Sequence, residues 1–317
     1  MNRLRIAVTA AALFVTAGCT ATSNNGFTRE TAPRAEAMSL LGQPLFAPVI
    51  PDEARARMEE QLAEARARYE RNPDDADAII WLGRRLAYLG YYRDAIRVFG
   101  EGIHKHPDDA RMYRHRGHRY ITTRQVSRAV ADLETAARLM ADRPDEVEPD
   151  GQPNSFNIPT STLKSNIWYH LALAHYLRHD FESALDAWRT AVEMADNDDM
   201  LVASSDWLYM TLRRLGREAE AEEVLARITP DMRILENDAY HRRLLMYKGL
   251  IAPDSVMPAD TRDAVQLATY GYGIANWHLY NGDRYTAETL FRRILDGPNW
   301  AAFGYIAAEA EVAGGAR

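Results

Sequence analysis

The sequence predicts an all-α fold in which antiparallel helix pairs stack into a right-handed superhelical solenoid. Small and large apolar residues recur with a period of about 34 residues from Ile79 to Ile294, which is the length of one helix–turn–helix unit. Amphipathic segments flank the periodic region at 52–71 and 300–312. Because each unit can bury its apolar face only against a neighbour, we expect these two segments to be N- and C-terminal capping helices that close the stack against solvent.

The first unit shows the packing pattern most clearly. Leu82 and Gly83 are followed by Ala95, Phe99 and Pro107. Gly83 and Ala95 allow two helices to approach closely, while Leu82 and Phe99 fill the seam between them. This spacing resembles the tetratricopeptide repeat (TPR). The resemblance implies a helix A and a helix B in every unit, with side chains of helix A lining a concave groove.

Later units keep the same register, with the seam alanine at Ala129, Ala184, Ala221 and Ala287. The step from the second unit to the third exceeds one period, and the extra residues predict an inserted loop at 142–163. The step between the last two seam alanines spans about two periods, so a degenerate unit should lie between them. We expect its first helix at 235–248 and its second helix to be broken by Pro253 and Pro258.

The N-terminal residues predict a lipoprotein signal peptide at 1–18. Arg3 and Arg5 precede an apolar stretch that is too short to span a bilayer as a helix. The stretch ends in Thr-Ala-Gly-Cys19, which resembles the lipobox of bacterial lipoproteins. The resemblance implies lipidation of Cys19 and, because Thr20 rather than Asp follows it, an outer membrane lipoprotein that faces the periplasm. An ordinary signal peptide with an incidental cysteine is the alternative.

The polar segment that follows predicts a flexible tether at 19–51, and the solenoid at 52–317 should form a single domain. A formal net charge of −7 at pH 7 argues against nucleic acid as a partner. One cysteine excludes an intramolecular disulfide and a cysteine-rich metal cluster. No catalytic or phosphate-binding motif is present, so we expect no enzyme activity, no cofactor and no metal.

One histidine pair, His175 and His179, has metal-ligand spacing, because positions i and i+4 share a helix face. We interpret both as packing residues. His175 falls where the repeat places a packing tyrosine, and His179 falls in the turn between two helices. The alternative is a metal- or small-ligand-binding hydrolase that uses histidine and arginine side chains of the groove.

The expected binding surface is the concave groove formed by the A helices. Its early part should present basic, amide and aromatic side chains, namely Arg84, Tyr88, Arg111, Arg114, His118, Asn166, Tyr169 and Tyr176. Arginine binds a carboxylate through two parallel hydrogen bonds, so this set favours an extended peptide that carries carboxylates. A solvated charged face without a ligand is the alternative.

The inserted loop should lie close to this groove. Its first half carries carboxylates at Asp142, Asp145, Glu146, Glu148 and Asp150. The repeat topology brings them near Arg111 and Arg114, so we expect the loop to fold over the early groove and to compete with an acidic ligand. A surface loop without a role is the alternative.

The combination of lipobox, tether and repeats resembles the NlpI-type periplasmic lipoproteins, with the best agreement at 273–283 and 287–291. Segments 114–120 and 153–162 resemble a set of uncharacterised bacterial TPR proteins. The first resemblance implies a periplasmic, membrane-anchored adaptor or scaffold whose protein or peptide partners include envelope proteases or peptidoglycan hydrolases. A purely architectural oligomer is a third hypothesis.

Overall fold

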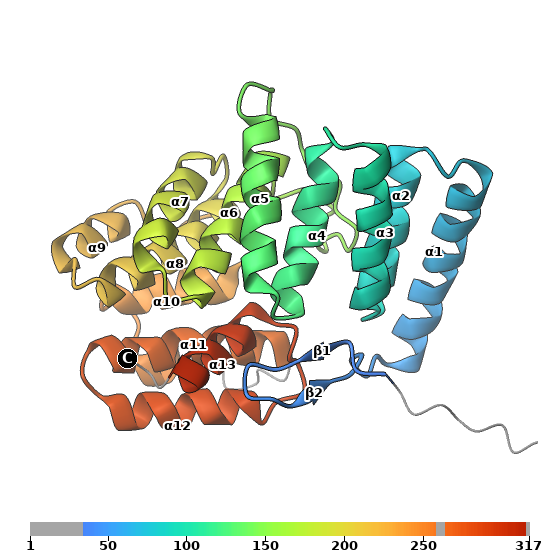
Figure 1. Ribbon diagram of the computed structural model, residues 1–317. Coiled ribbons are helices and arrows are strands. Elements are labelled where there is room, and N and C mark those ends of the chain that lie inside the picture. The colour runs from blue at the N-terminus through green and yellow to red at the C-terminus, as the bar shows by residue number, and fades with distance from the viewer. Residues whose placement is uncertain (1–33, 258–263, 315–317) are drawn as a thin grey trace, which may run out of the picture. The chain divides into compact units, whose positions relative to one another are not determined.

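The computed structural model describes residues 34–257 and 264–314, and the signal peptide and Cys19 lie outside the described residues. Nine helices form a row of mostly antiparallel pairs (Figure 1). They are α1 (Asp52–Arg71), α2 (Ala76–Tyr88), α3 (Tyr92–Lys105), α4 (Ala110–Thr122), α5 (Val126–Met140), α6 (Leu163–Leu177), α7 (Phe181–Glu193), α8 (Asp198–Arg214) and α9 (Glu218–Leu225).

The C-terminal part adds four helices and a single 3₁₀ turn within the described residues. They are α10 (Asp238–Tyr247), η1 (Pro253–Ser255), α11 (Ala264–Tyr280), α12 (Arg284–Leu295) and α13 (Phe303–Gly314). The strands of the described ranges, β1 (Ala37–Met38) and β2 (Pro44–Leu45), form one short antiparallel hairpin. The all-α prediction is therefore confirmed. Among the described helices, none combines the length and the apolar character that crossing a membrane would require.

The seam of each helix pair is built as the repeat motif predicts. The seam alanines are fully buried at Ala95, Ala129, Ala184, Ala221 and Ala287. Gly83 lies so close to the ring of Phe99 that a Cβ at Gly83 would be 2.4 Å from Phe99 Cε1. Gly117 approaches Leu133 in the same way, with a Cβ distance of 2.8 Å to Cγ. Small residues therefore set the spacing within each pair, and the helices pack sequentially as in a TPR superhelix.

The turns between helix A and helix B share one backbone conformation. A residue with positive φ occupies each of them: Gly90 (82°), Arg124 (62°), His179 (58°), Gly216 (70°) and Gly282 (90°). This conformation is easily adopted by glycine but costs other residues free energy because the Cβ approaches the backbone. Arg124 and His179 are thus held in an unfavourable conformation by the contacts that their side chains make.

Of the two helices expected for the degenerate unit, the described residues contain the first. α10 lies within the range expected for that helix, and the short turn η1 follows where Pro253 was expected to break the second. Pro258 lies outside the described residues. α10 packs on α8 and α11. An ion pair between Arg243 and Asp206, both almost inaccessible to solvent, joins α10 to α8.

The predicted tether is wrong for residues 34–51, because this segment packs on the repeats. Leu45 is buried in the same core as the first helix pairs. The carboxylate of Glu36 accepts a hydrogen bond of 2.9 Å from the backbone N–H of Arg93. The indole Nε1 of Trp300 donates to the carbonyl oxygen of Phe46 over 2.7 Å. Polar composition did not reveal these long-range contacts; residues 19–33 lie outside the described residues.

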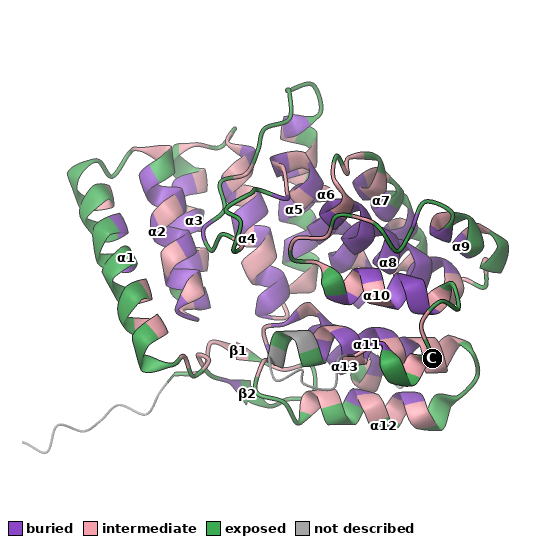
Figure 2. Ribbon diagram, turned by 180° about the vertical axis from the view of Figure 1, so that it is seen from behind, coloured by how far each residue is buried: buried purple, intermediate pink, exposed green. Residues whose placement is uncertain are grey.

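The prediction that 300–312 forms a solvent-facing cap is also wrong. α13 packs against α11, α12 and α6, and most of its length is buried (Figure 2). Its carboxylates Glu309 and Glu311 are 1% exposed and pair with Arg124 and Arg214 at 2.6 Å each. At the other end, α1 matches the expected exposed cap, since it buries only Leu62 and Ala65.

Candidate functional site

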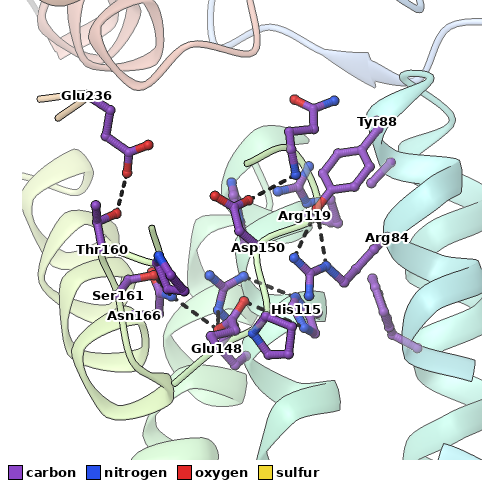
Figure 3. Close-up of a pocket in the computed structure, with 17 residues that line it drawn as sticks. Arg84, Tyr88, His115, Arg119, Glu148, Asp150, Thr160, Ser161, Asn166 and Glu236 are labelled. Atoms are coloured by element: carbon purple, nitrogen blue, oxygen red, sulfur yellow. Dashed lines mark hydrogen bonds and ion pairs between the residues drawn. The ribbon is translucent and has the colours of Figure 1, made fainter. Parts of the chain in front are cut away.

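A cavity of about 290 Å³ lies beside the A helices α2 and α4, under the loop that joins α5 to α6. We call residues 142–162 the inserted loop; Figure 2 shows it crossing in front of α4. The cavity is lined mainly by polar side chains (Figure 3). Its lining comprises Arg84, Ala87, Tyr88, Phe99, Arg114, His115, His118, Arg119, Glu148, Pro149, Asp150, Gln152, Pro159, Thr160, Ser161, Asn166 and Glu236.

The base of the inserted loop is fixed to the start of α6. The carboxylate of Asp145 accepts hydrogen bonds from the Thr162 hydroxyl at 2.6 Å and from the Lys164 N–H at 3.0 Å. Thr162 in turn caps α6 through the N–H of Ser165. Val147 and Thr162 form an antiparallel bridge. These contacts turn the loop back toward the A helices, so Glu148 enters the cavity.

Glu148 lies at the centre of the site. Its carboxylate is 3.0 Å from Nε of Arg114, and the two side chains are 10% and 9% exposed. The amide of Asn166 donates to the same carboxylate over 3.2 Å. Arg114 and Asn166 were predicted to bind a ligand carboxylate, and both already contact a carboxylate of this chain. The expected fold-over of the loop is thus present, with Glu148 as its inserted charge.

The next part of the loop closes on α2. Arg85 donates through Nη1 to the carbonyl oxygen of Gly151 at 3.0 Å. Gly151 lies directly on Tyr88, where a Cβ would be 2.0 Å from the phenol oxygen. A side chain at Gly151 would therefore displace the Tyr88 ring or the loop, and glycine permits this close contact.

Two cations of the cavity have no carboxylate partner in the part of the chain that the structure describes. Arg84 donates to the phenol oxygen of Tyr88 over 3.1–3.2 Å, and Arg119 lies over the ring of Tyr92. Across the described residues, neither guanidinium makes an ion pair within 4.0 Å. Burial lowers the pKa of Arg119 to about 10, so it is still charged at neutral pH.

The remaining carboxylates of the lining are bound to the inserted loop itself. Asp150 accepts a hydrogen bond of 2.9 Å from the N–H of Gln152. Glu236 accepts from the hydroxyl of Thr160 and, over 3.5 Å, from the amide of Asn154. These two carboxylates shape the loop, while the guanidinium groups of Arg84 and Arg119 are left available to an anion.

Neutral histidines lie at the site: His115 and His118 line the cavity, and His170 packs on His118. Burial, together with the nearby arginine cations, holds the pKa of His115, His118 and His170 well below the usual 6.5. The rings of His118 and His170 are 4.4 Å apart, and Phe303 of α13 packs on His118 at 5.3 Å. At neutral pH these rings therefore add no positive charge, and the arginines dominate the electrostatics.

The structure does not bring Arg111 to this site. Its guanidinium pairs with Asp109 at 2.6 Å and with Asp77 at 2.8 Å. Arg111 lines a separate surface depression near His106 and Arg143. The expectation that Arg111 and Arg114 act together is wrong, because the residue at the first turn of α4 is held by the helix N-cap Asp109.

Tyr169 and Tyr176 are also unavailable to a ligand of the groove. The hydroxyl of Tyr169 accepts a hydrogen bond from Trp207 Nε1 at 2.9 Å, and Tyr176 is 1% exposed. The Tyr176 hydroxyl accepts from Tyr272 at 2.8 Å and from Asn276 at 3.0 Å. Both tyrosines were expected on an open face; α10 and α11 cover that face.

The histidine pair of the alternative hypothesis makes separate contacts. His175 Nδ1 is 3.2 Å from the carboxylate of Asp180, and His179 Nε2 is 3.6 Å from that of Glu311. In the ranges 34–257 and 264–314, no three His, Cys, Asp or Glu residues are arranged to hold one metal ion. These histidines join turns and helices to one another.

Sequence reasoning missed Arg119, Gln152, Thr160 and Glu236. Arg119 follows His118 directly, and the repeat register assigns only one of two neighbouring residues to the concave face. The other three enter from the inserted loop and from the segment before α10. A repeat pattern does not predict the path of such segments, so no signal in the sequence places them.

No family model matches the sequence, and no curated protein matches it. Among solved structures, the chain is similar to YrrB, described as a TPR protein with an unusual peptide-binding site, at 16% identity and a TM-score of 0.42, over 73% of this chain and 91% of that one. A tetratricopeptide repeat protein from Parabacteroides merdae has 11% identity and a TM-score of 0.48, over 81% and 93%. PilW, described as a widely conserved type IV pilus biogenesis factor, has 13% identity and a TM-score of 0.44, over 76% and 87%.

At such identities the similarity concerns the repeat architecture alone, because one fold serves many functions. The helix pairs with their buried seam alanines therefore show the fold, an all-α stack of helix pairs that pack sequentially as in a TPR superhelix. Stacked repeats of this kind form an extended concave surface.

Proposed function

We propose that this protein is a membrane-anchored periplasmic TPR adaptor that binds an acidic segment of a partner protein in the cavity under the inserted loop. The observation that carries the proposal is the pair Arg84 and Arg119, two guanidinium groups of one cavity without an ion-pair partner among the described residues. A buried cation is stabilised by an anionic partner, so the cavity favours a ligand that supplies carboxylates.

The rest of the lining suits a peptide. Asn166, Thr160 and Gln152 contribute amide and hydroxyl groups that can hydrogen-bond peptide N–H and C=O groups. α10, α11 and α13 cover the late A helices, so the ligand is a short segment or a chain end. This replaces the expectation of a peptide extended along the whole groove.

The anchor and the compartment are proposed from the sequence. The apolar stretch that ends at Cys19 supports an outer-membrane lipoprotein that faces the periplasm. The resemblance to NlpI-type proteins makes envelope proteases and peptidoglycan hydrolases the first partners to test. Replacement of Cys19 by Ser should release the protein from the membrane pellet into the soluble periplasmic fraction. A variant that stays in the pellet would exclude the lipid anchor.

The binding site is tested by crosslinked capture from the native cell envelope. The variants are Arg84→Ala, Arg119→Ala and, as matched control, Arg111→Ala, which removes a guanidinium that lies outside the cavity. Partners identified by mass spectrometry with the wild type should remain with Arg111→Ala and be lost with the other two. Synthetic peptides from the acidic segments of those partners should then bind about 10–100-fold more weakly to Arg84→Ala, since a charge-assisted hydrogen bond contributes about 1.5–3 kcal/mol. Equal capture by all variants contradicts the proposal.

A further inference from the structure

Glu148 differs from Asp145 and Asp150 of the inserted loop in the partners of its carboxylate. Asp145 and Asp150 serve local turns of the loop, whereas Glu148 enters the cavity and pairs with Arg114 of α4. The groups around it come from two A helices. Arg114 of α4 forms an ion pair with it, although the Nε of Arg114 makes no aligned hydrogen bond to it, and Asn166 of α6 donates a hydrogen bond to it. This is the arrangement of a bound ligand carboxylate, supplied here by the chain itself.

We propose that Glu148 is an internal ligand whose carboxylate holds the position that a partner's carboxylate takes when the inserted loop opens. This inference rests on the proposed function, and it adds the regulation and the ligand class of the same site. An incoming carboxylate would find a cation and a donor already nearby, since Arg114 Nε and Asn166 Nδ2 lie 3.0 and 3.2 Å from the present carboxylate. Among the described residues, the buried Nε of Arg114 is without a hydrogen-bond partner and can still donate to it. Arg114 is further oriented by a 3.1 Å contact between its Nη1 and Nδ1 of His115.

The inserted loop is attached in a way that permits such an exchange. Between residues 142 and 162, only Gly151 and Thr160 are buried, and the apolar side chains of Val147, Phe156 and Ile158 are exposed. The loop therefore lacks an apolar anchor, and its opening would expose little additional apolar surface. The segment 148–152 is tied to the A helices through the Glu148 carboxylate and through the Gly151 carbonyl. By contrast, Thr160 is bound to Glu236 and to Asn197, so the second half of the loop stays in place.

The exchange also defines which ligands gain from it. A single carboxylate that displaces Glu148 replaces one Arg114 partner by another, with no net increase in ion pairs. A ligand with a second carboxylate nearby forms an additional ion pair, because Arg84 and Arg119 line the same cavity and are unpaired within the described residues. The site therefore selects segments with at least two neighbouring carboxylates, such as an acidic residue at the end of a chain, over singly charged ligands.

The experiment is chemical rescue of the full-length protein. Glu148→Ala leaves Arg114 buried without its partner and opens space for a small anion. Its midpoint of thermal unfolding should fall, and sodium acetate should raise it again by about 2–4 °C in a saturable manner, which sodium chloride at equal ionic strength should not do. Asp132→Ala is the matched control: Asp132 is also 10% exposed and pairs with Arg116 at 2.7 Å, but neither residue lines the cavity.

Rescue of Glu148→Ala alone supports the proposal. The absence of rescue, or equal rescue of Asp132→Ala, overturns it. If Glu148→Ala does not fold, the variant Glu148→Gln keeps the shape of the side chain and removes the charge. Hydrogen exchange of residues 147–152 should then be faster than in the wild type, and unchanged exchange overturns the proposal. Acetate rescue without any captured partner would refute the proposed function alone, whereas partner loss on Arg84→Ala without acetate rescue would refute the internal ligand alone.

Discussion

The early and late halves of the concave face are built from the same repeat positions but have opposite structures. Around α2 and α4 the face holds a polar cavity that the exposed inserted loop covers. Around α6 and α8 it is filled by α10, α11 and α13, with aromatic contacts such as that between Trp207 and Tyr272. Whether a helix-A side chain can contact a ligand or belongs to the core therefore depends on which segment of the chain covers it.

The two halves also differ in how their arginines are paired with carboxylates. Glu309 and Glu311 of α13 pair with Arg124, in the turn between α4 and α5, and with Arg214, at the end of α8. All four side chains are at most 5% exposed. In the late half, α13 therefore occupies the place that a ligand would take, as a permanent part of the fold. In the early half, Arg84 and Arg119 remain without an ion-pair partner among the described residues.

The largest expected effect tests whether the late half is structural. Glu309→Gln removes the charge that compensates Arg124, whose side chain is 3% exposed. An uncompensated buried charge costs about 3–5 kcal/mol of unfolding free energy. Chemical denaturation should show this loss, whereas Glu101→Gln, which breaks an exposed pair with Arg97, should cost at most about 1 kcal/mol. Equal losses would mean that α13 does not lock the late half.

The second effect separates the halves by pH. His115, His118 and His170 have a lower pKa in the folded protein than the usual 6.5, chiefly because they are buried. Below about pH 6.5 the unfolded chain therefore binds more protons than the folded protein. The unfolding free energy accordingly decreases as the pH falls below this value. Each histidine contributes a slope of about 1.4 kcal/mol per pH unit.

A carboxyl of the late half acts in the opposite direction. Burial raises the pKa of Asp206 to about 6, although Arg243 lowers it, so protonation below that value favours the folded state. One carboxyl opposes several histidines, and net stability should still fall between pH 6.5 and 5. His118→Gln should flatten the measured dependence of unfolding free energy on pH, with His104→Gln as the exposed control. If His118→Gln left the pH dependence of the unfolding free energy unchanged, the buried histidines beside the cavity would not be its cause.

The smallest effect concerns the turns. Gly216 has a φ of +70° and open space around a Cβ, so Gly216→Ala should cost about 1–2 kcal/mol through backbone conformation alone. His179 has the same conformation but contacts Glu311. His179→Gly relieves the backbone and loses that contact, so its net effect on unfolding free energy should stay below about 1 kcal/mol. A large loss on His179→Gly would show that the contact with α13 outweighs the strain.

The sequence predicts the helix pairs well, because seam residues such as Gly83 and Ala129 report local packing that recurs in every unit. It also assigns Arg84, Tyr88, Arg114, His118 and Asn166 to one concave groove, and the structure brings these five residues to one cavity. That they bind a peptide stays a prediction. It fails for Tyr169 and Tyr176, since a repeat register specifies which helix face a residue occupies and not what covers that face. The covering helices are distant in sequence, and their docking depends on contacts that no local pattern encodes.

Glu309 also links regions that are made at very different times. Its carboxylate binds Arg124 of the second unit and accepts from the backbone N–H of Leu40 in the hairpin, 185 and 269 residues earlier in the chain. At about 5–20 residues per second, a ribosome needs roughly 15–50 s to reach Glu309 after Leu40 has been synthesised. Repeats can fold by adding neighbours, but contacts this distant in sequence form late. The hairpin therefore lacks this partner until residue 309 has been synthesised, however early the first helix pairs fold.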